Sequence, residues 1–146
     1  MNKVEFRAEG LPLPVWILGA EKFIHKVLET LGPRNWEFSV LFCDNRYIKS
    51  LNSRFRSMDE ATDVLSFPLG ERSRGGRYLA GDIAISLEAL EENVKFFKVS
   101  ADEELRRLLV HGILHLYGAE HATNKEGEPM LKIQEQILTT VTEKIL

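Results

Sequence analysis

The segment that most constrains the fold of this chain runs from Ser100 to Tyr117. Ser100 and Glu103 have the S-x-x-E spacing of a helix N-terminal capping box, and an apolar run follows directly. A helix over this segment is apolar on nearly every side, through Leu105, Leu108, Leu109, Val110, Ile113, Leu114 and Leu116. Such a helix has to be covered by other parts of the protein. We therefore predict a central, buried helix around which the other elements pack.

Strand-like and helix-like patterns alternate through the rest of the chain. Alternating or short apolar runs predict four strands, at 2–6, 36–42, 64–67 and 78–86. Helical spacing and capping residues predict helices over 14–31, 44–55 and 87–97, and a last helix that begins near Pro129. Pro68 is expected to end the third strand. Together these elements predict an α+β (mixed α/β) fold, with a small four-stranded sheet packed against about five helices.

Length and composition are those of one ordinary globular domain. The 146 residues contain no repeat or linker, so we expect a single domain over 1–146. No apolar run approaches the roughly 20 residues that a membrane helix needs, and no secretory signal is evident, so we expect a cytoplasmic protein. The formal net charge of -3 argues against a general nucleic-acid binder but leaves room for a local basic surface.

Three of the four histidines lie within residues 111–121. His111 and His115 are four residues apart, which places both imidazoles on one face of a helix. We expect Gly118 to end that helix, so that the chain turns back and brings His121 toward the other two. Three imidazoles with one open coordination position are typical of a catalytic zinc site. The sequence therefore predicts one Zn²⁺ held by His111, His115 and His121.

The same histidine spacing occurs in the metzincin proteases. Those enzymes have a glutamate directly after the first histidine, and it serves as the general base. The corresponding residue here is Gly112, which cannot accept a proton. The ligand geometry is retained, but proteolysis lacks its base. Imidazoles also bind copper, nickel and iron, so zinc is favoured by the hydrolytic chemistry of an open site rather than by ligand type alone.

The segment HGILHLYGAEH at 111–121 resembles the signature of the YbeY family of bacterial endoribonucleases, commonly written H-G-x-L-H-L-x-G-x-D-H. Two further blocks resemble the family in the same order. The first begins at Leu51-Asn52, continues through Arg56 and ends in ATDVLSFP at 61–68, and the second is GDIAIS at 81–86. Glu120 replaces the usual aspartate, and Ala61 replaces the usual proline.

The resemblance implies a single-strand-specific, zinc-dependent endoribonuclease. Such an enzyme acts in ribosomal RNA maturation, chiefly at the 3′ end of the small-subunit RNA, and in ribosome quality control. The resemblance also implies zinc on His111, His115 and His121, a functional arginine at Arg56, and contact with the small ribosomal subunit and an assembly GTPase. We expect Arg56 to bind phosphate or to stabilise charge in the transition state. No membrane or DNA partner is expected.

Other residues are weaker candidates for the site. Glu120, Asp63 and Asp82 are possible supporting carboxylates. A basic surface that contacts the RNA backbone is expected from some of Arg54, Arg56, Arg72, Arg74, Arg77, Arg106 and Arg107. Phe55 and Tyr78 have rings that are able to stack on a base, but we predict that both pack in the core.

Two other functions stay open at this point. One is a zinc hydrolase of a non-RNA substrate, such as a peptidase or amidase without the usual glutamate. The other is a non-catalytic ribosome-assembly factor stabilised by its metal, in which Glu120 or another side chain closes the fourth position. Within the ribonuclease reading, the nucleophile is either zinc-bound water or the 2′-OH of the RNA.

Overall fold

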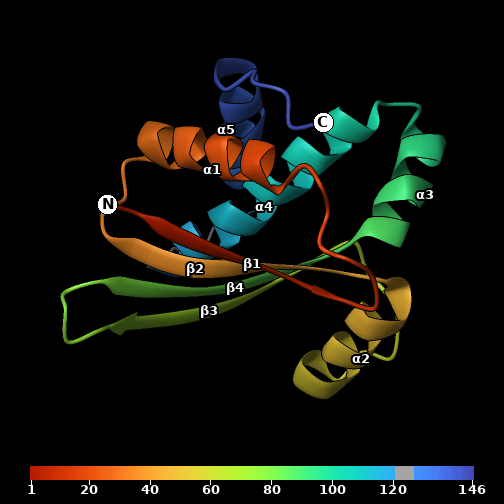
Figure 1. Cartoon of the computed structure of the whole chain (residues 1–146), viewed down its shortest axis with the longest axis horizontal. Helices are drawn as coiled ribbons and strands as arrows, with labels where there is room; N and C mark the ends of the chain where they lie inside the picture. Colours follow the sequence, from red (N-terminus) through yellow and green to blue (C-terminus); the bar gives the residue numbers. More distant parts are fainter. Residues whose placement is uncertain (121–126) are drawn as a thin grey trace.

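The computed structural model describes residues 1–120 and 127–146. Its elements in chain order are β1 (Lys3–Glu9), α1 (Ile17–Leu31), β2 (Trp36–Cys43), α2 (Asn45–Arg56), β3 (Val64–Arg72), β4 (Tyr78–Ser86), α3 (Leu87–Phe97), α4 (Ala101–Glu120) and α5 (Gly127–Thr140). The four strands and five helices of the described residues confirm the predicted mixed α+β fold (Figure 1). None of these helices is long and apolar enough to cross a membrane.

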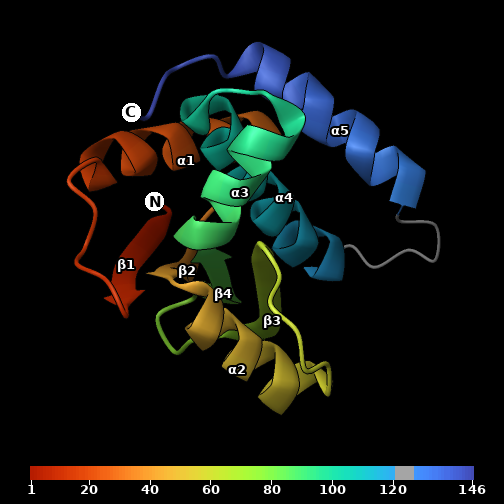
Figure 2. The same cartoon turned by 90° about the vertical axis from the view of Figure 1, so that its right-hand side faces the viewer.

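The sheet has the strand order β1-β2-β4-β3. β1, β2 and β4 are parallel, whereas β3 runs antiparallel to β4 and forms one edge. Helices α1, α4 and α5 lie over one face of the sheet, and α2 lies against the other (Figures 1 and 2). The larger hydrophobic cluster fills the face under α4, and a smaller cluster around Ile48 and Leu65 fills the space under α2.

Helix α4 is the centre of the fold, as its sequence predicts. The Ser100 hydroxyl accepts a hydrogen bond from the Glu103 N–H at 3.0 Å, which is half of the expected capping box. The apolar residues of the helix are buried, and it contacts β3, β4, α1, α3 and α5. Gly112 sets its closest approach to the sheet, because a Cβ at that position would lie 2.8 Å from Cγ2 of Ile83 on β4.

Several predicted element bounds are wrong. β3 continues through Pro68 to Arg72. Proline is tolerated there because β3 is an edge strand, where an outward-facing residue needs no N–H for the ladder. Helix α4 continues past Gly118 to Glu120. Glycine inside a helix costs only about 1 kcal/mol relative to alanine, which the packing of this helix outweighs. The predicted helix over 14–31 begins three residues later, at Ile17.

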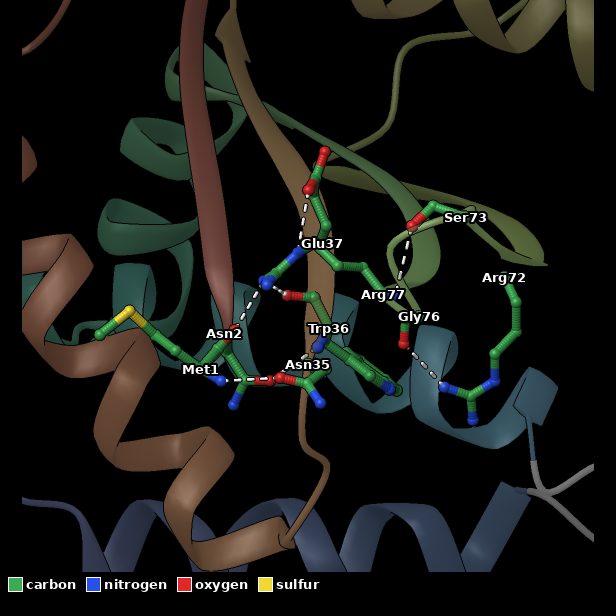
Figure 3. Close-up of polar contacts among 9 residues, drawn as sticks. All are labelled: Met1, Asn2, Asn35, Trp36, Glu37, Arg72, Ser73, Gly76 and Arg77. Atoms are coloured by element: carbon green, nitrogen blue, oxygen red, sulfur yellow. Dashed lines mark hydrogen bonds and ion pairs between the residues drawn. The ribbon is translucent and has the colours of Figure 1, made fainter.

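Arg77 fastens the start of β4 to the neighbouring strands. Its Nε donates to Glu37 at 3.1 Å, and its Nη2 donates to the backbone oxygens of Met1 at 2.6 Å and Trp36 at 3.1 Å (Figure 3). This guanidinium is therefore engaged in holding the sheet together. It does not contribute to the predicted basic surface as a free charge.

Asp102 fastens the last residues of the chain to α4. Its Oδ1 accepts hydrogen bonds from the Ile145 N–H at 2.6 Å and the Leu146 N–H at 3.0 Å, and its Oδ2 accepts from Arg106 at 2.9 Å. Burial by itself would raise the pKa of this carboxyl, but the two backbone N–H groups and the Arg106 guanidinium together lower it below the ordinary value. The ionised form is thus part of the folded structure.

Gly81→Ala is expected to destabilise the protein by about 2 kcal/mol or more. Gly81 has φ +137°, and a Cβ there would lie 2.2 Å from the backbone oxygen of Phe67. Gly75→Ala is the matched control, because its nearest neighbour is the Ser73 Oγ at 3.9 Å and its φ is not in the left-handed region. Urea unfolding of both variants measures the difference, and equal stabilities would contradict this account of β4.

Asp102→Asn is expected to lower the free energy of unfolding by about 1–2 kcal/mol at pH 7, because charged hydrogen bonds are lost. The folded pKa of Asp102 is lowered, so its stabilisation is present above the unfolded value of about 4 and disappears as the pH falls through the folded value. Unfolding curves over a pH series should therefore show that the difference in free energy of unfolding between wild type and variant becomes smaller in acid. A gap that does not change with pH would exclude this role for the carboxylate.

Candidate metal centre

Two of the three predicted metal ligands face each other on α4. His111 and His115 lie one helical turn apart, and their Nε2 atoms are 3.0 Å from each other. Two nitrogen ligands of one tetrahedral zinc, each about 2.0–2.1 Å from the ion, would be separated by roughly 3.3 Å. The two imidazoles therefore already point at a common position, and this donor pair fits a divalent metal ion.

Gln134 holds the other side of His111. Its Oε1 lies 2.9 Å from His111 Nδ1, and the Gln134 side chain is buried. A carbonyl oxygen in this place selects the tautomer with hydrogen on Nδ1, which leaves the Nε2 lone pair free toward His115. Metal-binding histidines commonly have such a partner on the second ring nitrogen. Helix α5 thus orients the His111 ring on α4.

The surroundings of His115 favour its neutral form. Its side chain retains an exposed surface, but partial burial lowers the pKa of the imidazole below its ordinary value, and the neighbouring His111 and Arg56 act in the same direction. A histidine has to be neutral to offer its nitrogen lone pair to a metal. The Arg56 charge is thus near enough to His115 to disfavour a second positive charge there.

Arg56 and the histidine helix are joined through β3. The Arg56 Nη2 donates to the backbone oxygen of Ser66 at 2.7 Å. The hydroxyl of Ser66, a buried residue, donates in turn to the backbone oxygen of Gly112 on α4 at 3.1 Å. Arg56 belongs to the last turn of α2, so these contacts bring three elements together at the β3 edge. A guanidinium next to two convergent imidazoles suits the binding of a phosphate group.

Asp63 and His111 line the same cavity, which has a volume of about 460 Å³. This cavity extends along His111 and Gln134 and is also lined by Asp63, Asn93 and Glu104. Asn93 donates to Asp63 at 3.0 Å and to the buried Glu104 at 2.9 Å. Burial raises the pKa of Glu104 above its ordinary value, against the opposing effects of Asn93 and Arg107. The cavity beside His111 thus combines two carboxyl groups with an apolar lining from Val64, Phe97, Val99 and Leu108.

Of the predicted supporting carboxylates, Asp82 is not brought to the pair. Asp82 on β4 accepts a hydrogen bond from the Ser39 hydroxyl at 2.5 Å. Its side chain is on the face of the sheet opposite that of the next residue, Ile83, which contacts α4. His121 lies outside the described residues, and so does the side chain of Glu120. Within residues 1–120 and 127–146, no cluster of three His, Cys, Asp or Glu side chains is arranged to hold a metal.

The predicted basic surface is divided among several parts of the protein. Arg106 is paired with Asp102 at 2.9 Å. Arg107 lies between Glu104 at 3.9 Å and Glu135 at 2.5 Å, where it links α4 to α5. The Arg56 charge lowers the pKa of His115, and Arg107 lines the cavity that extends along His111.

Sequence reasoning missed Gln134 and Ser66. Ile133 has helical spacing from Met130 and Ile137, which predicts an inward position, but it is 42% exposed and Gln134 takes the buried position. Gln134 is four residues after Met130 and three before Ile137, so its polar amide within an apolar stripe was the available signal. Ser66 gave no such signal, because its partner on α4 is defined only by the tertiary structure.

Comparisons with known proteins identify the family of this chain. The family model described as "Endoribonuclease YbeY" matches residues 15–142. The protein of that name from Treponema denticola is 48% identical, and the match covers 81% of this chain and 79% of that protein. The one from Treponema pallidum is 44% identical, and the match covers 94% of this chain and 89% of that protein. The solution structure of a Thermotoga maritima protein has a TM-score of 0.68 and 30% identity, and covers 94% of this chain and 88% of its own. The chain therefore belongs to the YbeY family of endoribonucleases.

Proposed function

We propose that this protein is a zinc-dependent, single-strand-specific endoribonuclease that acts in ribosomal RNA maturation, chiefly at the 3′ end of the small-subunit RNA. The observation that supports this most directly is the 3.0 Å approach of the His111 and His115 Nε2 atoms next to the Arg56 guanidinium. Membership of an endoribonuclease family supports RNA as the substrate. The proposal places the protein in the cytoplasm, at the small ribosomal subunit and in contact with an assembly GTPase.

The residues divide the work between ligation and phosphate binding. His111 and His115 would hold the metal, together with His121 from outside the described residues. When bound, a zinc ion supplies Lewis acidity and lowers the pKa of a bound water to about 7. Arg56 binds the phosphate that is to be cleaved and offsets the negative charge that grows on its oxygens. Gln134 keeps His111 in the tautomer that leaves Nε2 free.

His115→Ala is expected to lose both the bound metal and RNA cleavage, since it removes one of the ligands. Arg56→Ala is expected to keep the metal and to cleave about 10²–10³-fold more slowly, because the charge of the transition state is less well stabilised. Zinc content by elemental analysis and cleavage of a single-stranded RNA by gel electrophoresis measure both effects. His25→Ala on α1 and Arg7→Ala on β1, at the opposite edge of the sheet, are the matched controls.

The outcomes separate the proposal from its rivals. Equal cleavage by all variants would mean that a contaminating nuclease is responsible. A folded, zinc-loaded wild type that cleaves no RNA would favour an assembly factor or a hydrolase of another substrate. Circular dichroism of each variant shows whether lost activity comes from unfolding.

Gln134→Ala is expected to weaken zinc binding roughly 10- to 100-fold, because His111 loses the partner that orients its ring. Competition with a chromophoric chelator measures this affinity. Gln136→Ala is the control, since Gln136 is an exposed glutamine on the same helix. Equal zinc affinities for wild type and Gln134→Ala would show that α5 does not tune the ligand.

A further inference from the structure

The last turn of α2 carries an aromatic ring on the surface. Phe55 is 61% exposed, which corrects the prediction that it packs in the core. Its ring meets the half-buried ring of Phe67 on β3 edge-on, with centroids 5.6 Å apart and planes inclined by 67°. Phe67 thus supports the Phe55 ring from one side, while much of the Phe55 side chain stays exposed to solvent. Exposure of a large apolar ring to water is unfavourable, so a ligand that covers the ring would gain binding free energy.

Two arginines flank this pair of rings. The Arg54 guanidinium carbon is 5.9 Å from the centroid of Phe55, and that of Arg56 is 5.8 Å from the centroid of Phe67. Aromatic rings interleaved with cations complement single-stranded nucleic acid, since bases stack on rings and phosphates bind guanidinium groups. A protein partner with an apolar surface would gain less binding free energy here, because it would have to bury the charges of both arginines.

The ring pair is close to the metal centre but on the other face of the sheet. Phe67 faces α2, whereas the preceding residue, Ser66, faces α4 and bonds to Gly112. Arg56 contacts the Ser66 backbone oxygen between these two faces. A strand of RNA that crosses the β3 edge would therefore have a phosphate at Arg56 and a neighbouring base at Phe55.

The segment that carries Phe55 is held in place. Asn52, a buried residue of α2, donates a hydrogen bond to the Glu60 backbone oxygen at 3.0 Å, and its own backbone oxygen accepts from the Met58 N–H at 3.2 Å. These bonds fix the connection from α2 to β3 on both sides. The rings are therefore positioned before any ligand binds, which reduces the ordering that binding requires.

We propose that Phe55 and Phe67, with Arg54 and Arg56, form a stacking platform for a base of single-stranded RNA next to the scissile phosphate. The proposal rests on the proposed ribonuclease function and adds a site to it. Phe55 supplies the open ring face, Phe67 supports it, and the two arginines bind the adjoining backbone. Stacking accepts any base, so the platform gives affinity and register rather than sequence specificity.

The test is RNA binding with metal removed by a chelator, so that cleavage plays no part. Phe55→Ala and Phe55→Leu are each expected to weaken binding of a fluorescein-labelled polyadenylate roughly 5- to 100-fold in anisotropy titrations. Phe55→Trp is expected to bind as well as wild type or better. Phe96→Ala is the matched control, because Phe96 is 80% exposed on α3. Thermal melts check that every variant is folded.

Two further readouts isolate stacking. An oligomer of 2-aminopurine should lose fluorescence on binding to wild type and Phe55→Trp but not to Phe55→Leu. An abasic oligomer with the same backbone should bind wild type and Phe55→Leu equally. The proposal would be overturned if folded Phe55→Leu bound polyadenylate as tightly as wild type does. It would also be overturned if wild type and Phe55→Leu quenched 2-aminopurine fluorescence equally.

The platform and the ribonuclease function fail in different ways. If wild type cleaves RNA while Phe55→Leu binds and quenches like wild type, the platform is wrong and the enzyme stands. If binding and quenching depend on Phe55 but zinc-loaded wild type cleaves nothing, the platform stands and the proposed cleavage is wrong.

Discussion

The close contact between α4 and β4 is the constraint on which the rest of the structure depends. Gly112 lets the helix approach Ile83 to a distance at which any other side chain would collide. This contact sets the height of α4 above the sheet, and His111 and His115 flank it along the helix. The close packing of an apolar interior keeps such a position well defined. The histidine pair is thus placed by a core contact and not by a loop.

Helices on opposite faces of the sheet contribute to one site because β3 passes between them. Ser66 bonds to α4 with its side chain and to Arg56 of α2 with its backbone oxygen. Helix α5 enters from a third direction through Gln134 and the Arg107–Glu135 ion pair. Displacement of any one of these elements would therefore alter the distance between the histidines and the arginine. The positions of these side chains therefore depend on the packing of the whole domain.

Sequence patterns predicted the elements well and their mutual contacts poorly. Periodicity identified α4, and the spacing of His111 and His115 predicted their approach, because both depend on local helix geometry. The exposure of Phe55 was predicted incorrectly, since helical spacing alone does not show where a helix extends beyond the sheet. Pro68 was misread because strand order decides whether a proline is tolerated, and that order is a tertiary property. The roles of Ser66 and Gln134 depend on partners 46 and 23 residues away in sequence.

The position of β3 at the edge of the sheet has a consequence for self-association. An edge strand presents backbone groups that can pair with a strand of a second molecule. In the described part of this chain, Pro68 lacks one such donor, and Arg56 occupies the outward-facing oxygen of Ser66. The side chain proposed to bind substrate phosphate therefore also shields an adhesive edge. Loss of the Arg56 side chain would therefore expose a backbone acceptor on this edge, in addition to removing the group proposed to bind phosphate.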